Sequence, residues 1–274
     1  MIDYLLAALF GAVQGITEIL PVSSSGHLVF FHEIWPNFAA SDQLGFDVAL
    51  HAGTLIALIV FFRNDIINLI GSTVSYLRND RTEKTIYNSR ITWLIIVSTI
   101  PAAVIGFFFE SDIEKIFRSM VWVGIMLILG GLVFLLIEIT AETSRDLSGL
   151  TISHALIIGM AQVLAFIPGV SRSGSTIAAG RALKLSHYQA ARFSFLLSLP
   201  IVFGASIKKI FDLTKEGLPN SEWNVIIIGF VFSAFVGISA LRFLLKLFQN
   251  HSLRGFAYYR IVLGLTVLVV FLIF

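Results

Sequence analysis

Two similar stretches of this sequence decide its fold: GAVQGITEILPVSSSGH at residues 11–27 and GMAQVLAFIPGVSRSGS at residues 159–175. Aligned without gaps at an offset of 148, they are identical at seven of 17 positions, which include a glutamine, two serines and a glycine. Each stretch is apolar and contains a proline near its middle. Because proline removes a backbone donor and glycine loosens a helix, each stretch should form a helix, a break and a second helix.

Both broken regions, 4–34 and 152–185, are predicted to be re-entrant hairpins, since broken backbone at membrane depth survives only inside protein or beside a water-filled cavity. Six further segments have the roughly 20 apolar residues that a membrane span needs: 45–62, 91–109, 119–139, 190–208, 223–245 and 256–274. Three spans follow each hairpin, and an odd number inverts the second half. We expect an all-α polytopic membrane protein, a single integral membrane domain built as an inverted-topology repeat of residues 1–148 and 149–274. Interrupted segments at matching places in such halves point to a site near the bilayer midplane.

Composition agrees with a membrane protein. Of 274 residues, 57% are hydrophobic and 13% charged, and the mean hydropathy is +0.88, whereas soluble domains carry about 25% charged residues. The net charge of only +2 argues against nucleic acid as a partner. The absence of cysteine excludes disulfides, thiolate metal sites and thiol nucleophiles. Asp3 stands where a signal peptide has basic residues, so the N-terminus is expected to be part of the mature protein.

Loop charges predict the orientation, because cytoplasmic loops carry an excess of Lys and Arg. The 63–90 connection is the densest basic loop and is placed in the cytoplasm. The 110–118 loop has three acids against two bases and falls outside. The 208–222 loop also falls outside, although it carries three lysines. On this count both termini are external, the first hairpin enters from outside and the second from the cytoplasm.

Two charged residues interrupt the apolar hairpins, Glu18 in the first and Arg172 in the second. A charge at membrane depth costs about 2.5–3.5 kcal/mol on insertion scales, so it is seldom kept there without a reason. If the hairpins meet at the midplane, Glu18, His27 and Arg172 converge. A purely structural ion pair that ties the hairpins together is the alternative. The surrounding serines favour a catalytic or binding site, since a structural ion pair does not need several hydroxyl groups beside it.

The first motif offers hydroxyls, a glycine and an imidazole in the run Ser23, Ser24, Ser25, Gly26 and His27. A helix that begins here would cap itself with a serine and present its first N–H groups to an anion. Ser24 and His27 are three apart and share a helix face, and a serine beside an imidazole is the minimum for an activated nucleophile. Capping alone would explain any single serine. A histidine bonded to a carbonyl is the alternative for His27.

The second motif repeats this arrangement around a guanidinium, with Ser171, Arg172, Ser173, Gly174 and Thr176. Arginine presents a planar fork that fits two phosphate oxygens and stays charged in any surroundings. The flanking hydroxyls and the glycine backbone would complete an oxyanion cradle. The motif therefore predicts phosphate binding.

Gln14 and Glu18 are four apart on the predicted first helix and face the same way. A hard cation could be held by the Gln14 amide oxygen, Glu18 and substrate phosphate oxygens, because Mg²⁺ commonly takes few protein ligands plus phosphate. Asp47 and His51 also stand four apart; they could flank the site entrance, but a local hydrogen bond between them is the expectation. Arg260, after two tyrosines, is expected to be an interfacial anchor.

At these motifs the sequence resembles the undecaprenyl-diphosphate phosphatase family of the BacA type, through QGITEILPVSSSGHL and PGVSRSGSTIAAG, and also through FRND, FSFLLSLPI and YYRIVLG. The resemblance implies a phosphatase of the bacterial cytoplasmic membrane that converts undecaprenyl diphosphate to undecaprenyl phosphate, the lipid carrier of peptidoglycan synthesis. It also implies a link to bacitracin resistance, a requirement for Mg²⁺ or Ca²⁺, and an active site reached from the outer face.

The resemblance implies site residues as well: Gln14 and Glu18 for the metal, Ser24 and His27 for catalysis, and Arg172 for phosphate. Ser171, Ser173 and Thr176 match the rest of its second motif. Family members with glutamate at the first position have two carboxylates. This chain has Gln14 there, so Glu18 must carry the charge alone.

Several alternatives stay open at this stage. Ser24 is the preferred nucleophile, with His27 as its base or as the acid for the leaving group; His27 could instead attack phosphorus, or Glu18 could orient a water. A polyprenyl-phosphate flippase is the rival function, since inverted repeats with broken helices are transporter architecture. Small residues at Gly124, Gly130 and Gly131 could let helices approach within one chain or across a homodimer.

Overall fold

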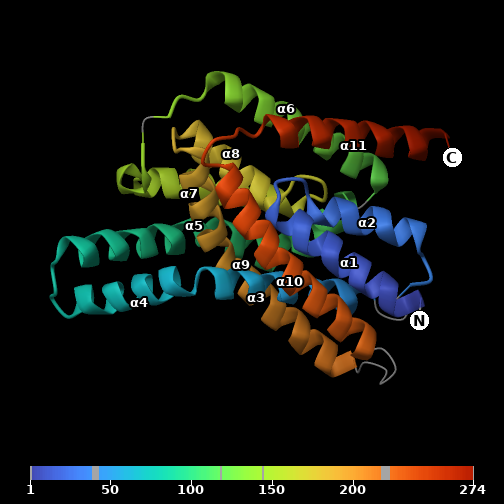
Figure 1. Ribbon diagram of the computed structural model, residues 1–274, viewed down its shortest axis with the longest axis horizontal. Helices are drawn as coiled ribbons and strands as arrows, with labels where there is room; N and C mark the ends of the chain where they lie inside the picture. The colour runs from blue at the N-terminus through green and yellow to red at the C-terminus, as the bar shows by residue number, and fades with distance from the viewer. Residues whose placement is uncertain (1, 39–42, 118, 144, 217–222, 274) are drawn as a thin grey trace.

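The computed structural model describes residues 2–38, 43–117, 119–143, 145–216 and 223–273 (Figure 1). In these ranges the chain is all helical apart from turns and one isolated bridge between Arg145 and Leu185. The long helices, in chain order, are α1 (Ile2–Ile19), α2 (Ser24–Ile34), α3 (Gln43–Phe61), α4 (Arg63–Leu77), α5 (Glu83–Phe117), α6 (Met120–Thr140), α7 (Ile152–Val163), α8 (Arg172–Ala182), α9 (His187–Glu216), α10 (Trp223–Leu247) and α11 (Arg254–Ile273). Two 3₁₀ turns, η1 (Leu147–Gly149) and η2 (Leu164–Phe166), flank α7.

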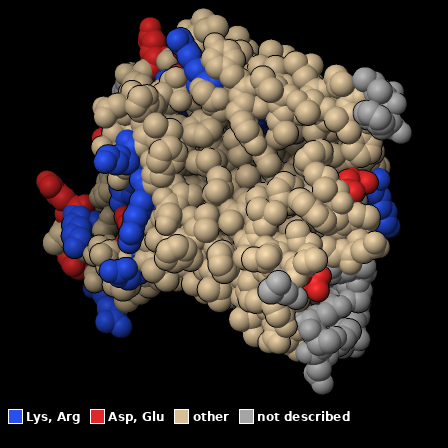
Figure 2. Space-filling view, turned by 45° about the vertical axis from the view of Figure 1, so that its right-hand side comes forward, with Lys and Arg blue, Asp and Glu red and all other residues tan. Residues whose placement is uncertain are grey.

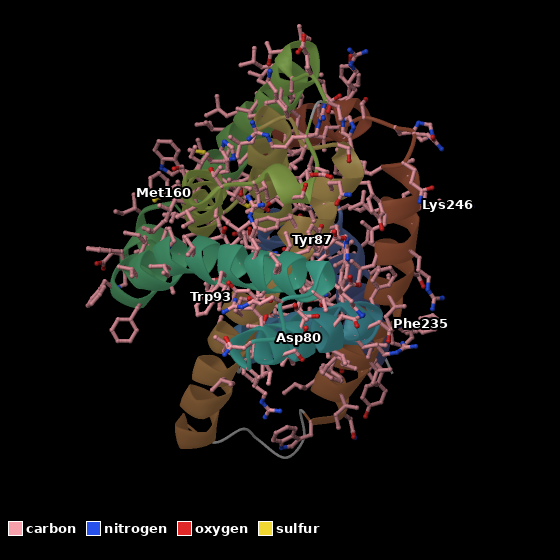
Figure 3. All side chains as sticks on the ribbon, turned by 90° about the vertical axis from the view of Figure 1, so that its left-hand side faces the viewer. Asp80, Tyr87, Trp93, Met160, Phe235 and Lys246 are labelled. Carbon is pink, nitrogen blue, oxygen red and sulfur yellow. The ribbon has the colours of Figure 1, made fainter. Side chains whose placement is uncertain are left out.

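Six of the described helices are long and apolar enough to cross a membrane: α1, α5, α6, α9, α10 and α11. Figure 2 shows Lys, Arg, Asp and Glu gathered at the edges of the molecule, with a wide uncharged surface between them. Large apolar side chains such as Trp93, Met160 and Phe235 point outward and are exposed (Figure 3). Such a surface suits lipid as solvent, and the predicted all-α, polytopic membrane fold is confirmed.

The six spans differ from the predicted six at one place. Helix α1 qualifies as a span by itself, although the sequence suggested only one arm of a hairpin. Helix α3, predicted as a span at 45–62, bends by 68° into α4 at Phe62, and the bent pair counts as a seventh span only if the two helices cross together. The apolar run continues through Ile66, Ile67 and Ile70 beyond the bend, so a hydropathy window marks where apolar residues lie and misses the change of direction.

The predicted connections were too long. Most of 63–90 is helical, in α4 and the first turns of α5, and α5 runs on through 110–117. Helix α9 likewise takes in 208–216, while 217–222 lie outside the described residues. Charged residues such as Lys, Arg and Glu are good helix formers. A rise in charge therefore marks the end of the apolar segment and not the end of the helix.

The two hairpins are braced in the same way. Helix α1 packs on α10, and α7 packs on α5. A Cβ on Gly11 of α1 would collide with the carbonyl oxygen of Gly229, and one on Gly159 of α7 would collide with that of Ser98. The two glycines are equivalent in the aligned stretches. Each therefore permits a close helix–helix approach that a larger residue would prevent.

Helices α6 and α11 lie side by side along one edge of the molecule (Figure 1). The small residues noted in the sequence serve this contact. A Cβ on Gly124 would press on Leu268, one on Gly131 would lie 2.8 Å from the Ala257 carbonyl oxygen, and Gly130 faces Arg260. Their close approaches therefore lie within one chain, and a homodimer stays a prediction.

Both hairpins turn on a serine with a left-handed backbone. Ser23 has φ 74° and Ser171 has φ 70°, a conformation that costs a non-glycine residue about 1–2 kcal/mol. The Ser23 hydroxyl accepts from the Gly26 N–H at 3.3 Å, and the Ser171 hydroxyl accepts from the Gly174 N–H at 3.1 Å. Each serine thus caps the helix that follows it, α2 or α8. The repeat boundaries themselves stay a prediction.

Candidate active site

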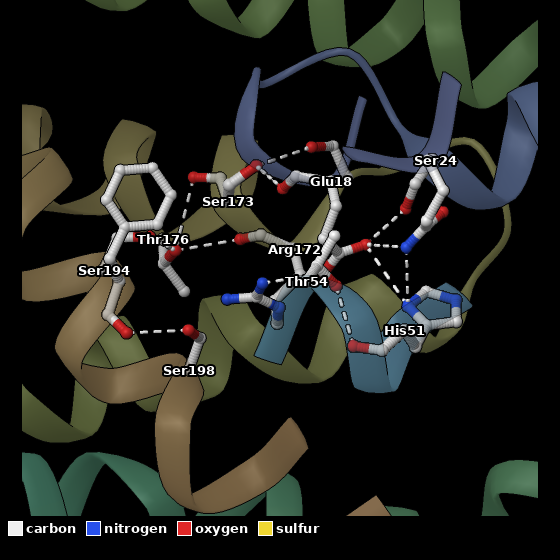
Figure 4. Close-up of polar contacts among 12 residues, drawn as sticks. Glu18, Ser24, His51, Thr54, Arg172, Ser173, Thr176, Ser194 and Ser198 are labelled. Carbon is white, nitrogen blue, oxygen red and sulfur yellow. Dashed lines mark hydrogen bonds and ion pairs between the residues drawn. The ribbon is translucent and has the colours of Figure 1, made fainter. Parts of the chain in front are cut away.

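The carboxylate of Glu18 is the meeting point of three helices (Figure 4). Its Oε1 accepts a hydrogen bond from Arg172 Nη2 of α8 at 2.8 Å. Its Oε2 accepts from Ser24 Oγ of α2 at 2.6 Å and from Gln14 Nε2, one turn earlier on α1, at 3.2 Å. The Glu18 side chain is only 7% exposed. The two hairpins therefore converge on one buried, fully paired carboxylate.

The hairpin turns place the two residues that grip this carboxylate. Ser24 and Arg172 are the first residues of α2 and α8, each directly after a capping serine. They also occupy equivalent positions at the offset of 148. The same strained turn thus delivers a hydroxyl from one side and a guanidinium from the other. Strained backbone of this kind clusters at active sites and ligand clamps.

A cavity of about 330 Å³ opens beside Glu18. Its apolar wall includes Val48, Ala102, Ile201, Val202 and Ala205. Its polar lining is formed by Thr17, Glu18, Ser24, Ser25, Asp47, His51, Gln162, Ser171, Arg172 and Ser206. A mostly apolar pocket with a few convergent polar groups is the usual form of a small-molecule site.

Not every predicted phosphate ligand lines this cavity. Ser23 pairs with Ser25 at 3.3 Å and also caps α2. Ser173 is shared between Ser171 and the carbonyl oxygens of Glu18 and Leu20. Ser173 thus joins the second turn to the first, whereas Ser23 and the N–H groups of Gly26 and Gly174 are held within their own turns. Of the predicted phosphate-binding set, Ser25, Ser171 and Arg172 line the cavity, and Ser23, Gly26, Ser173, Gly174 and Thr176 lie among the supporting contacts.

Thr176 and its neighbours form a polar layer between α8 and α9. The Thr176 hydroxyl donates to the Arg172 carbonyl oxygen at 2.8 Å and pairs with the Ser194 hydroxyl at 2.6 Å. Both side chains are buried. This contact fixes the first turn of α8, from which Arg172 extends.

The His27 side chain faces α11 and does not face Ser24. Its Nδ1 lies 2.7 Å from the Ser23 carbonyl oxygen, and its Nε2 lies 2.7 Å from the hydroxyl of Tyr259. The two rings are parallel within 2°. Both ring nitrogens are therefore engaged, which matches the carbonyl-bonded alternative for this histidine. Its catalytic role stays a prediction.

His51 of α3 is the imidazole that reaches Glu18. Its Nδ1 lies 2.9 Å from Gln14 Nε2 and 3.5 Å from Glu18 Oε2, and its side chain is 36% exposed and lines the cavity. The expected local hydrogen bond to Asp47 was wrong, because Asp47 pairs with His32 at 3.0 Å. The spacing of four singled the pair out, but only the packing of α3 on α1 gives His51 its partners.

Arg260 is fully buried, so its assignment as an interfacial anchor was wrong. Its guanidinium donates to the carbonyl oxygens of Pro21 at 3.3 Å and Gly169 at 3.0 Å, and also to that of Met126 at 3.3 Å. Pro21 and Gly169 lie in the breaks of the two hairpins. The guanidinium therefore ties both turns together from behind, a role that no sequence pattern signalled.

Several buried polar atoms around Glu18 have no hydrogen-bond partner among the described residues. They are Gln14 Oε1, Arg172 Nη1 and both amide atoms of Gln162. Such atoms are rare in folded proteins and often mark a place for a water, an ion or a ligand.

A hard cation fits this donor set in kind. In the described part of the chain no three His, Asp or Glu side chains group as metal ligands, so the protein offers Glu18 and the unpartnered Gln14 amide oxygen. The Gln14 nitrogen now faces Glu18, and a half-turn of the amide would bring its oxygen there. Mg²⁺ is commonly held by one or two protein ligands with phosphate and water completing its shell.

Comparison with known proteins settles the family. A family profile described as "Bacitracin resistance protein BacA" matches residues 7–266. The chain belongs to the BacA family. BacA relatives named undecaprenyl-diphosphatase include one from Geobacter sulfurreducens, 44% identical over 97% of both chains. Another, from Pelobacter propionicus, is 43% identical over 96% of this chain and 95% of its own. A third, from Rubrobacter xylanophilus, is 42% identical over 96% and 97%. All the site residues described above lie inside the matched BacA region.

Proposed function

We propose that this protein is a membrane phosphatase that hydrolyses undecaprenyl diphosphate to undecaprenyl phosphate and inorganic phosphate, which recycles the lipid carrier of peptidoglycan synthesis. The observation that carries the proposal is the hydrogen bond of 2.6 Å from the Ser24 hydroxyl to Glu18, a carboxylate that also holds Arg172. A nucleophile, a base and a phosphate ligand thus meet at one cavity. The names of the relatives support the same substrate.

In the proposed reaction Ser24 Oγ attacks the terminal phosphorus and passes its proton to Glu18. The new O–P bond forms as the bond to the bridging oxygen breaks, and undecaprenyl phosphate leaves. Water then hydrolyses the phosphoserine, which releases inorganic phosphate and returns the proton to Ser24. Glu18 replaces His27, the base predicted from the sequence, because the Ser24 hydroxyl points to Glu18 and both His27 nitrogens are engaged.

Arg172 neutralises the phosphate in this scheme. Its Nη2 holds Glu18, and its Nη1 has no partner among the described residues, so one guanidinium can join carboxylate and phosphate. Phosphoryl transfer depends mainly on positioning and charge stabilisation. A divalent cation, Mg²⁺ or Ca²⁺, held by Gln14 and Glu18 would add positive charge against the diphosphate oxygens.

We place the protein in the bacterial cytoplasmic membrane with the cavity opening to the outer face, on the strength of the loop charges and the family resemblance. The flippase alternative is not favoured. Transport needs an anion cradle, but it does not need a serine hydrogen-bonded to a buried carboxylate.

Phosphate release from undecaprenyl diphosphate in detergent tests the function, because leaflets do not exist there and flipping gives no signal. Ser24→Ala and Arg172→Ala should lose release while the protein stays folded. Ser233→Ala is the matched control, since this buried hydroxyl donates to the Leu50 carbonyl oxygen and lies outside the cavity lining. An inactive wild-type protein, with and without Mg²⁺, would overturn the proposal.

Trapping the covalent intermediate tests the nucleophile separately. Brief reaction with substrate labelled in its terminal phosphate, followed by digestion, should recover label on Ser24. Phosphate on a histidine nitrogen would remove the serine mechanism and leave His27 or His51 as the attacking group.

A further inference from the structure

A glutamine that lines the cavity, Gln162, has no hydrogen-bond partner among the described residues. Gln162, near the end of α7, is only 2% exposed, and it lines the same cavity as Glu18 and Arg172. Neither its amide oxygen nor its amide nitrogen makes a hydrogen bond within the described chain. Burial of an amide without a partner is unfavourable, so this position calls for a ligand.

The internal repeat shows why the amide has no partner. Gln162 aligns with Gln14, which donates to Glu18 one turn further along α1. At the matching place after Gln162 stands Phe166, which accepts no conventional hydrogen bond. The second stretch thus has the amide without its carboxylate. No described residue of its own hairpin provides a partner for the Gln162 amide, whereas a ligand that enters the cavity would provide one.

The neighbouring groups indicate what would enter. Arg172 Nη1 is a second unpartnered donor, on a residue that lines the same cavity, and Ser171 adds a hydroxyl to that wall. An anion with several acceptor oxygens satisfies donors of this kind. We propose that Gln162 is a substrate-binding residue whose Nε2 donates to a phosphate oxygen of the diphosphate, beside Arg172. This proposal rests on the proposed function, since the diphosphate is the expected ligand.

Gln162→Met keeps the length of the side chain and removes both polar amide atoms. The probe is methylenediphosphonate, a diphosphate analogue that is not hydrolysed, used in direct titration and as an inhibitor of phosphate release. The dissociation constant and KM should rise by about tenfold to a hundredfold, as expected for loss of one hydrogen bond to a charged group. The melting temperature of the ligand-free protein should not fall, because an unpartnered amide is replaced by an apolar group of similar shape.

Gln189→Met is the matched control, because its amide oxygen is also buried without a partner but lies outside the cavity lining. It should bind methylenediphosphonate as the wild type does. Gln162→Glu keeps the shape and places a negative charge against the phosphate, so it should weaken binding more than Gln162→Met. It also decides the matter should Gln162→Met fail to fold.

Gln162→Met and Gln162→Glu binding within twofold of the wild type would overturn the inference and leave a buried water as the partner. The outcomes separate this from the function. Normal hydrolysis with unchanged Gln162 variants would refute the inference alone. An inactive wild type whose affinity for methylenediphosphonate still depends on Gln162 would refute the hydrolysis and retain the anion site.

Discussion

Glu18 and Arg172 are 154 residues apart in the sequence, and their side chains meet at 2.8 Å. Each lies at the helix end beside the turn of a different hairpin, and both are largely shielded from solvent. Two interpretations of this ion pair are possible: it only holds the hairpins together, or it forms the centre of a phosphatase active site. The two interpretations predict different results for the same substitutions.

We expect Glu18→Gln to abolish phosphate release because it removes the base for Ser24 and keeps the hydrogen-bonding shape. Arg172→Lys, which keeps the charge but loses the fork, should lower turnover at least about a hundredfold. Turnover and melting temperature are measured together. Removal of one partner from a buried ion pair destabilises a protein by about 3–5 kcal/mol. A fall in melting temperature with turnover intact would establish the structural tie.

Separate replacement of His27 and His51 tests which histidine takes part in catalysis, His27 as the sequence predicts or His51 as the geometry indicates. His51→Ala should lower kcat about tenfold to a hundredfold, less than loss of the base itself, because its imidazole lies 3.5 Å from the Glu18 carboxylate that acts as the base. The loss of stability should be small, since His51 is partly exposed. His27→Phe should mainly lower the melting temperature. A double-mutant cycle with Tyr259→Phe measures the His27–Tyr259 coupling. A larger loss of kcat in His27→Phe than in His51→Ala would restore His27 as the catalytic imidazole.

Gln14→Glu tests the cation site by adding the second carboxylate that this chain lacks. It should lower the Mg²⁺ concentration that gives half-maximal activity, because a second anionic oxygen strengthens binding of a hard cation. The melting temperature measured at increasing Mg²⁺ concentration should rank the Mg²⁺ affinities of Gln14→Glu and the wild type in the same order, without an activity assay. Full activity of the wild type after exhaustive chelation would rule out the metal requirement.

Arg260→Met should destabilise the protein by about 2–4 kcal/mol, since it leaves the carbonyl oxygens of Pro21 and Gly169 without their donor. The measurement is the shift of the thermal or denaturant midpoint in detergent. Arg254→Met, at an exposed position of the same helix, is the control. Equal stability of the two variants would show that the turns hold together without the guanidinium.

Local chemistry made much of this site predictable. Pro21 and the Pro168-Gly169 pair are strong helix-breaking signals, and a carboxylate and a guanidinium in apolar surroundings must find partners. Those rules were enough to bring Glu18, Ser24 and Arg172 to one place. They needed no knowledge of how the helices pack.

The remaining contacts depend on packing that no local pattern records. His51 joins the site only because α3 lies on α1, and Arg260 reaches Pro21 across 239 residues of chain. The spacing of Ser24 and His27 placed them on one face of a helix. It could not show that Tyr259 on α11 would take the histidine ring. Side-chain contacts between residues far apart in the sequence could not be predicted from local patterns.

The crossed bracing of the hairpins has a practical consequence. Helix α1 packs on α10, and α7 packs on α5, so each hairpin is supported by a helix from the opposite half of the chain. A polypeptide cleaved between α6 and α7 would give two fragments, one with Glu18 and Ser24 and the other with Arg172. Neither fragment would have the scaffold for its own turn. Co-expression of the fragments should therefore be needed both to recover turnover and to protect either one from proteolysis.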